Sequence, residues 1–87
     1  MNSLVTDDFR ACFAALPVEI RELARKAYRR WRDNPSHPGL RFKPIRGHPG
    51  LRSVRVGRGW RALGRVDGDT ITRFWIGSHA DYDALIA

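Results

Sequence analysis

Five side chains in the second half of the sequence have types that can carry out acid–base and phosphate chemistry. They are Arg55, Arg61, Trp75, His79 and Tyr82. Histidine titrates near neutral pH, and arginine carries a fixed charge that can stabilise a phosphate. A base, a cation and an acid are what metal-free RNA cleavage by a ribose 2′-hydroxyl requires. Arg55, Arg61, His79 and Tyr82 are therefore the candidate catalytic residues.

A purely structural interpretation of the same residues stays open. His79 follows Ser78 at the start of an expected helix, so its role can be to cap that helix. Tyr82 lies one turn later and can pack on a core. In this interpretation the arginines bind an anion without any catalysis.

The segment from 52 to 79 predicts three consecutive antiparallel strands. Their turns are expected at 57–59 and 67–69, each with three loop residues between strands rich in β-branched and aromatic side chains. Because alternate side chains point to opposite faces, this register makes one apolar face and one basic face. The face expected to be buried holds Val54, Val56, Trp60, Ala62, Phe74 and Ile76. The face expected to be open holds Arg55, Arg61 and Trp75, with Leu63 and Arg73 beside them.

Two amphipathic helices precede these strands. The first follows Thr6 or Asp7 and the second begins at Pro17. Apolar residues recur at helical spacing, at Phe9, Cys12, Phe13 and Leu16 and then at Ile20, Leu23, Ala24, Ala27, Tyr28 and Trp31. Further elements expected are strands at 3–5 and 40–45 and a last helix at 79–86. The sequence thus predicts an α+β fold of two layers in a single domain, residues 1–87. A helical hairpin covers one face of an antiparallel sheet, and a short C-terminal helix follows.

The net charge of +7 is concentrated in one segment. Residues 34–66 hold eight Lys and Arg and no acid, whereas the rest holds eight against nine Asp and Glu. Such a field attracts a phosphate polyanion or an acidic protein. We expect Arg41, Lys43, Arg52 and Arg73 to bind RNA. Leu63 and Trp75, on the expected open face, suit an acidic partner with apolar side chains.

Other features exclude several classes of protein. One cysteine fits a reducing cytoplasm, and the first residues lack the pattern of a signal peptide. No apolar run approaches the ~20 residues of a membrane span. The three histidines lack a metal-ligand spacing, and no glycine-rich phosphate loop precedes a helix. We expect neither a metal nor a cofactor.

The chain resembles the RelE/ParE superfamily of toxins from bacterial type II toxin–antitoxin modules. The resemblance runs from the hairpin FRACFAALPVEIRELARKAYRRW through NPSHPGLRFK to the strands SVRVGRGWRALGRV and the ending FWIGSHADYDAL. VRVGRGWRALG and IGSHADYDAL are its most specific parts. The fold implied is the small microbial-RNase-like domain of these toxins.

The resemblance also implies a function. RelE-like members cleave mRNA in the ribosomal A site, ParE-like members poison DNA gyrase, and an acidic antitoxin from the same operon wraps the toxin. Arg55 and Arg61 match phosphate-contacting positions of the nucleases, and His79 and Tyr82 match the closing catalytic segment. Arg52 and Arg55 stand where some nucleases have lysine, so the general base must be His79 or Tyr82. The expectation is an mRNA endoribonuclease toxin. A gyrase inhibitor and a non-toxic RNA-binding domain are the alternatives.

Overall fold

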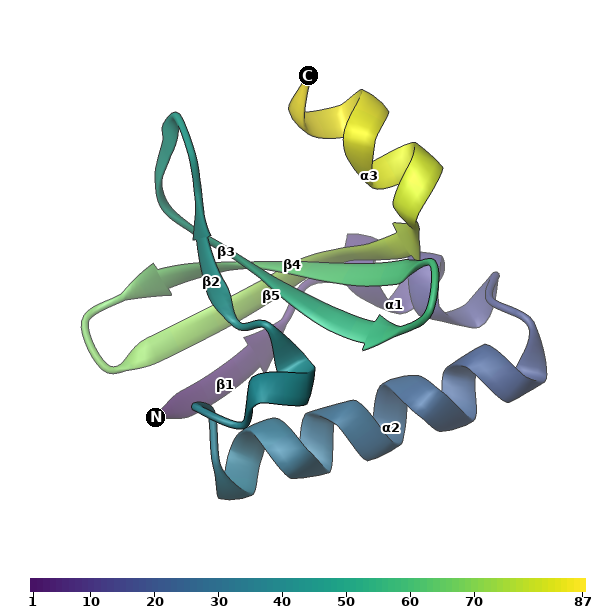
Figure 1. The fold of residues 1–87 in the computed structure, drawn as a ribbon, viewed down its shortest axis with the longest axis horizontal. Helices are drawn as coiled ribbons and strands as arrows, with labels where there is room; N and C mark the ends of the chain where they lie inside the picture. Colours follow the sequence, from purple (N-terminus) through teal and green to yellow (C-terminus); the bar gives the residue numbers. More distant parts are fainter.

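The computed structural model describes residues 1–87 as a five-stranded sheet with helices on both faces (Figure 1). The elements are β1 (Asn2–Val5), α1 (Asp7–Ala14), α2 (Val18–Asp33), the 3-10 turn η1 (Pro38–Leu40), β2 (Lys43–Ile45), β3 (His48–Gly57), β4 (Trp60–Asp67), β5 (Thr70–Ser78) and α3 (His79–Ile86). The strand order is β1-β5-β4-β3-β2. β1 runs parallel to β5, and every other pair is antiparallel. The predicted α+β class is confirmed.

The two N-terminal helices cover one face of the sheet, as predicted. Thr6 caps α1, because its hydroxyl accepts the Phe9 N–H at 3.1 Å. α1 packs mainly on β5 and α2 on β3, so the two helices cover different strands. Two clusters of buried side chains lie under them, one of Phe9, Leu16, Ala24, Val56 and Ile76 and one of Ala27, Trp31, Leu40 and Ile71. Leu23, predicted on the buried stripe, is instead 40% exposed.

The predicted pairing of β3 with β4 is confirmed along most of its length. Val54 lies opposite Ala62, and Arg55 lies opposite Arg61. Close to the turn, Gly57 rather than Val56 pairs with Trp60, so a bulge interrupts the register there. The bulge lies between the Arg55–Arg61 pair and the turn.

The predicted pairing of β4 with β5 is wrong. Asp67 pairs with Thr70, so the loop has two residues instead of three, and Gly68 adopts φ +59° at its first position. A second irregularity leaves Phe74 unpaired between the pairs Gly64–Arg73 and Leu63–Trp75. Phe74 was predicted on the face that α1 and α2 cover. The bulge moves it to the opposite face, where it packs against the cluster of Ile45, Leu63 and Tyr82.

The face that was expected to be open is partly covered by α3. Leu63 and Tyr82 form a small buried cluster with Ile45, against which Phe74 and Trp75 pack. Leu63 is only 2% exposed, which corrects its assignment to an open surface. Figure 1 shows α3 rising from the end of β5 on the side opposite α2.

The predicted strand at 40–45 is shorter than expected. Leu40 belongs to η1 and is 1% exposed, and Arg41 ends that turn in the left-handed region at φ 48°. The strand then begins at Lys43. The turn therefore contributes a core side chain that the pattern had assigned to a strand.

Candidate functional site

The start of α3 is fixed to the sheet by two hydrogen bonds. The Ser78 hydroxyl accepts the Asp81 N–H at 3.1 Å, which caps the helix. The His79 N–H donates to the Gly59 carbonyl at 2.7 Å, which joins the helix to the β3–β4 turn. These bonds hold His79 beside the first residues of β4 and the last residues of β5.

Tyr82 is the centre of a group of side chains on this face. Its ring lies 5.8 Å from the His79 ring and 6.5 Å from the Trp75 ring, measured between centroids. The Arg61 guanidinium carbon lies 5.4 Å from the same ring centroid, within the range of a cation–π contact. Tyr82 is 8% exposed. Packing therefore brings Arg61, His79 and Tyr82 together, three of the four candidate catalytic residues.

Ser53 helps to place Arg61. Its hydroxyl accepts a hydrogen bond from Arg61 Nη1 at 3.4 Å, and its side chain is almost fully buried. A buried hydroxyl needs a hydrogen-bond partner, so the contact satisfies Ser53 and also restricts the orientation of the Arg61 guanidinium. The sequence pattern did not single out Ser53, because the contact crosses from β3 to β4.

Asp83 is a second residue that the sequence pattern missed. Its carboxylate oxygen lies 3.0 Å from His79 Nδ1, one helical turn away. Both side chains are exposed, so the pair contributes little to stability. Its effect is on orientation, because an occupied Nδ1 leaves Nε2 to meet a substrate. The i, i+4 spacing of the two residues was the available signal.

Arg55, the fourth candidate, lies elsewhere. It pairs with Arg61 along the strands, but it lines a separate hollow of about 250 Å³ between α2, η1 and the end of β3. Lys26 and Arg30 line the same hollow. Arg55 thus contributes to a different basic site from the one around Tyr82.

Arg73 lies on the opposite side of the sheet from its expected position. Its guanidinium carbon sits 4.2 Å from the Tyr28 ring centroid and 5.1 Å from that of Phe9. Its Nε donates to the Ser3 hydroxyl at 3.1 Å. Burial lowers the pKa of Arg73, and the interaction with Tyr28 opposes that shift. Arg73 therefore faces the helices rather than the Tyr82 group.

The other predicted RNA-binding residues are spread over the surface. Arg41 and Lys43 are exposed beside η1 and on β2. Arg52 is half-buried, and its Nη1 donates to the Leu51 carbonyl at 3.1 Å. None of the three makes a hydrogen bond or a ring contact with His79 or Tyr82, so they form no single site with them.

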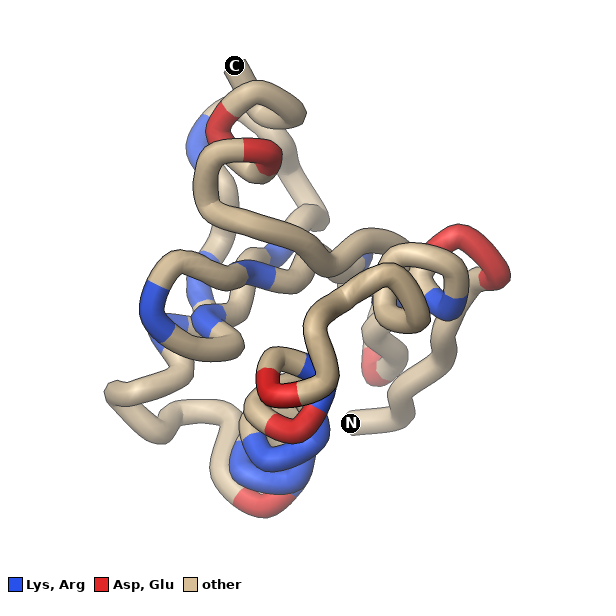
Figure 2. Tube along the Cα trace, turned by 90° about the vertical axis from the view of Figure 1, so that its right-hand side faces the viewer, with Lys and Arg blue, Asp and Glu red and all other residues tan.

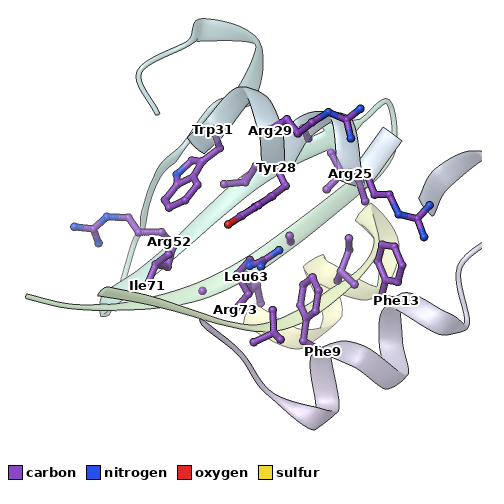
Figure 3. Close-up of a pocket in the computed structure, with 18 of the residues that line it drawn as sticks. Phe9, Phe13, Arg25, Tyr28, Arg29, Trp31, Arg52, Leu63, Ile71 and Arg73 are labelled. Carbon is purple, nitrogen blue, oxygen red and sulfur yellow. The ribbon is translucent and has the colours of Figure 1, made fainter. Parts of the chain in front are cut away.

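A larger cleft of about 370 Å³ separates the two N-terminal helices from the sheet (Figure 3). Its lining is mainly apolar, and Phe9, Phe13, Tyr28 and Trp31 contribute aromatic rings to it. The charged residues that line it are all arginines, at positions 10, 25, 29, 52 and 73. The indole N–H of Trp31 is buried there without a hydrogen-bond partner. The lining of the cleft is thus mainly apolar, and its charged side chains are all basic.

Two further observations concern the whole chain. None of the helices is long and apolar enough to cross a bilayer. No three side chains among His, Cys, Asp and Glu lie grouped as the ligands of a metal ion would.

The chain is similar in structure to several solved toxins. It aligns with a chain of the RelB–RelE antitoxin–toxin complex of Methanococcus jannaschii at TM-score 0.77 and 21% identity, covering 97% of this chain and 99% of that one. For the toxin–antitoxin complex RelBE2 of Mycobacterium tuberculosis the TM-score is 0.71 at 23% identity, covering 90% and 96%. For the YoeB/ParE toxin of Agrobacterium tumefaciens it is 0.71 at 18%, covering 91% and 99%. These likenesses establish a RelE-like fold.

The sequence itself matches a family profile. Residues 18–84, which run from the start of α2 into α3, match the ParE-like toxin domain. No curated protein matches the chain significantly. The matched range contains the Arg61, His79 and Tyr82 group and the hollow at Arg55. The chain therefore belongs to the ParE-like toxin domain family and is a toxin of the RelE/ParE type.

Proposed function

We propose that this toxin is a ribosome-dependent endoribonuclease that cleaves mRNA in the cytoplasm, and that a cognate antitoxin neutralises it. The observation that carries the proposal is the group around Tyr82. An oriented histidine and an arginine lie on the same aromatic ring, on the face of the sheet away from the N-terminal helices. These are the two groups that a metal-free phosphodiester cleavage needs most.

The proposed reaction uses His79 as the base. Nε2 of His79 accepts the proton of a ribose 2′-hydroxyl, and the 2′-oxygen then attacks the adjacent phosphorus. The bond from phosphorus to the 5′-oxygen of the next nucleotide breaks, and that oxygen takes a proton from water. The products are a 2′,3′-cyclic phosphate and a 5′-hydroxyl. Arg61 stabilises the charge that develops on the phosphate, and Tyr82 holds both side chains in place.

Cleavage in a reconstituted translation system, mapped by primer extension, tests this mechanism. Replacing a general base typically slows a reaction by ~10²–10⁴, so His79→Ala should lose cleavage to that extent. Arg61→Ala should lose cleavage and weaken ribosome binding, because it removes a fixed positive charge. His48→Ala is the matched control, since His48 is exposed at the start of β3, and it should cleave normally.

A ParE-like inhibitor of DNA gyrase is the second candidate function. The family profile that matches the chain favours it, as does arginine rather than lysine at positions 52 and 55. This function needs no acid–base group. If His79→Ala and Tyr82→Phe both arrest growth as strongly as the wild type, while supercoiling by purified gyrase falls, the nuclease proposal is rejected in favour of this one.

We also propose that the antitoxin inserts apolar side chains and a carboxylate into the cleft between the N-terminal helices and the sheet. Arginine is the only charged residue type in the lining, which suits an acidic segment. The aromatic lining suits apolar anchors. Trp75, half-buried on the α3 face, remains a proposed second contact.

A further inference from the structure

The hollow that contains Arg55 gathers positive charge without a partner. Lys26 and Arg30 come from α2, and Arg55 comes from β3. No acidic residue lines the hollow, and none of the three cations takes part in an ion pair or a side-chain hydrogen bond. Lys26 and Arg30 stand at i, i+4 on α2, where like charges repel each other. An anion between these side chains would remove that repulsion.

The lining of the hollow also suits a phosphate group. Gly39 and Gly57 form part of its wall, where the side chains of His37 and Leu23 pack close to the two glycines. Leu23, Ala27, Leu40 and Val56 supply the apolar part. Its volume of about 250 Å³ lies below the ~300–1,000 Å³ of typical small-molecule pockets. The site therefore fits a small anionic group better than a whole organic ligand.

The hollow lies next to the Tyr82 group across a single turn. Gly57 lines the hollow, while Gly59 accepts the hydrogen bond from the His79 N–H. Two Cα steps of ~3.8 Å each separate these glycines, so the two sites lie close together. Arg58 is exposed on the turn between them. Basic residues thus lead from Arg61 over Arg58 to Arg55 and the two α2 cations.

α2 presents two rows of basic residues to two different spaces. Lys26 and Arg30 line the hollow, whereas Arg25 and Arg29 line the larger apolar cleft. Figure 2 shows the run of Lys and Arg positions along α2 between acidic positions near its ends. The two rows have equal spacing and nearly equal charge. They therefore provide a test and its control on the same helix.

We propose that Lys26, Arg30 and Arg55 form a phosphate subsite for the RNA strand, a few nucleotides from the phosphodiester that His79 and Arg61 act on. This inference rests on the proposed nuclease function. A strand held at this subsite would cross the β3–β4 turn beside Arg58 and place one ribose against His79. The subsite supplies binding and positioning rather than acid–base chemistry.

The test measures binding of a ten-nucleotide RNA probe that carries 2′-deoxy residues and cannot be cleaved. Fluorescence anisotropy at several salt concentrations gives the affinity and the number of phosphates that the protein neutralises. Lys26→Ala with Arg30→Ala should weaken binding about tenfold and reduce the salt slope by about 0.7 for each phosphate that is no longer neutralised on single-stranded RNA. Arg55→Gln should act in the same direction. Arg25→Ala with Arg29→Ala is the control, and it should leave affinity and slope nearly unchanged.

Competition identifies the source of the phosphate. If an RNA strand occupies the subsite, an unlabelled ten-nucleotide RNA should compete, and millimolar inorganic phosphate or adenosine monophosphate should not. Competition by the mononucleotide at micromolar concentration would overturn the RNA assignment. Equal losses of affinity in the Lys26/Arg30 and Arg25/Arg29 pairs would overturn the subsite, since general charge would then explain them. Unchanged RNA binding with weakened antitoxin binding would assign the hollow to an acidic protein instead.

The probe separates this inference from the proposed function. Because the RNA cannot be cleaved, a toxin that proves to have no nuclease activity would still show the Lys26/Arg30 effect if the subsite exists. Conversely, normal cleavage by the wild type with no such effect would reject the subsite alone. Circular dichroism of each variant confirms folding, which the exposed α2 substitutions and the half-buried Arg55→Gln should preserve.

Discussion

At the scale of single residues, the contact between Asp83 and His79 decides which ring nitrogen of the histidine is available. The ring of an exposed histidine can rotate, and in its neutral form either ring nitrogen can carry the proton. The carboxylate oxygen 3.0 Å from Nδ1 favours the tautomer with a proton on Nδ1 and a lone pair on Nε2. Asp83 is therefore a positioning residue, and it acts on RNA only through His79.

We expect Asp83→Asn to slow cleavage by about tenfold, less than the ~10²–10⁴ expected for loss of the base itself. An amide still fits the site, but it can accept a hydrogen bond through its oxygen or donate one through its nitrogen, so it no longer favours the Nδ1–H tautomer. ¹⁵N chemical shifts of His79 should report a mixed tautomer population in this variant, which a purely structural role would not change. Asp81→Asn, exposed on the same helix, serves as the control. Unchanged shifts in Asp83→Asn would contradict the positioning role.

At the scale of elements, α3 carries the candidate base although it is short. The helix has eight residues and rests on the sheet through Tyr82 and Ile86. Its first turn depends on the Ser78 cap and on the bond from His79 to Gly59. The placement of His79 is therefore sensitive to the cap, in addition to the packing of Tyr82.

Removing the cap should affect cleavage more than stability alone predicts. Ser78→Ala should cost ~0.5–2 kcal/mol of unfolding free energy and lower cleavage, because the first turn of α3 loosens. Thr6→Ala removes the equivalent cap of α1 and should cost a similar amount while cleavage is retained. Urea denaturation and the cleavage assay together distinguish the two. Equal cleavage by both variants would show that the cap of α3 has no role in the site.

At the scale of the whole molecule, the sheet separates two surfaces. The Tyr82 group lies on the α3 side, and the apolar cleft lies on the side of α1 and α2. Substitutions in the cleft can therefore change a partner contact without touching the proposed catalytic residues. In such a molecule toxicity and neutralisation can be lost independently.

Phe13→Ser should give a toxin that still arrests growth but escapes its antitoxin. Phe13 lines the cleft, with the Arg25 guanidinium carbon 5.2 Å from its ring centroid. Growth is scored with and without the protein encoded beside the toxin gene, and affinity is measured by calorimetry. Val18→Ser, at an exposed apolar position on α2, is the control. If Trp75→Ala releases the antitoxin and Phe13→Ser does not, the antitoxin binds the α3 face instead.

Much of this architecture could be predicted from local sequence. The stripes of Phe9 and Leu16 and of Ala24, Ala27 and Trp31 are buried as the helical period predicts. Ser78 caps the last helix where the cap residue indicated. The pairing of Arg55 with Arg61 followed from a hairpin with few alternatives. These features depend on residues close in sequence, so the pattern contains the necessary information.

The pairing of β4 with β5 could not be predicted in the same way. A two-residue and a three-residue loop at Asp67–Asp69 both agree with the turn residues, and the bulge at Phe74 depends on the packing of Gly64. A Cβ at Gly64 would lie 2.8 Å from Ile71 Cδ1, so only glycine allows this approach. Arg73 was misplaced for this reason, and it contacts Tyr28 and Ser3 on the face that the N-terminal helices cover. Leu63 lies on its predicted face but is buried, because Tyr82 of α3 packs there.

The sequence by itself determined the class of fold, the two amphipathic helices, the basic hairpin and the nature of the candidate catalytic residues. Periodicity, helix caps and charge depend on residues close in sequence, so the sequence alone is enough to predict them. The tertiary structure alone decided which cations share a site. Arg61 joins Tyr82 and His79 because α3 returns over β4 and β5, whereas Arg55, its neighbour across the strands, joins Lys26 and Arg30 because α2 packs on β3. Side chains adjacent in a hairpin were divided between two sites by the helices that pack against each strand.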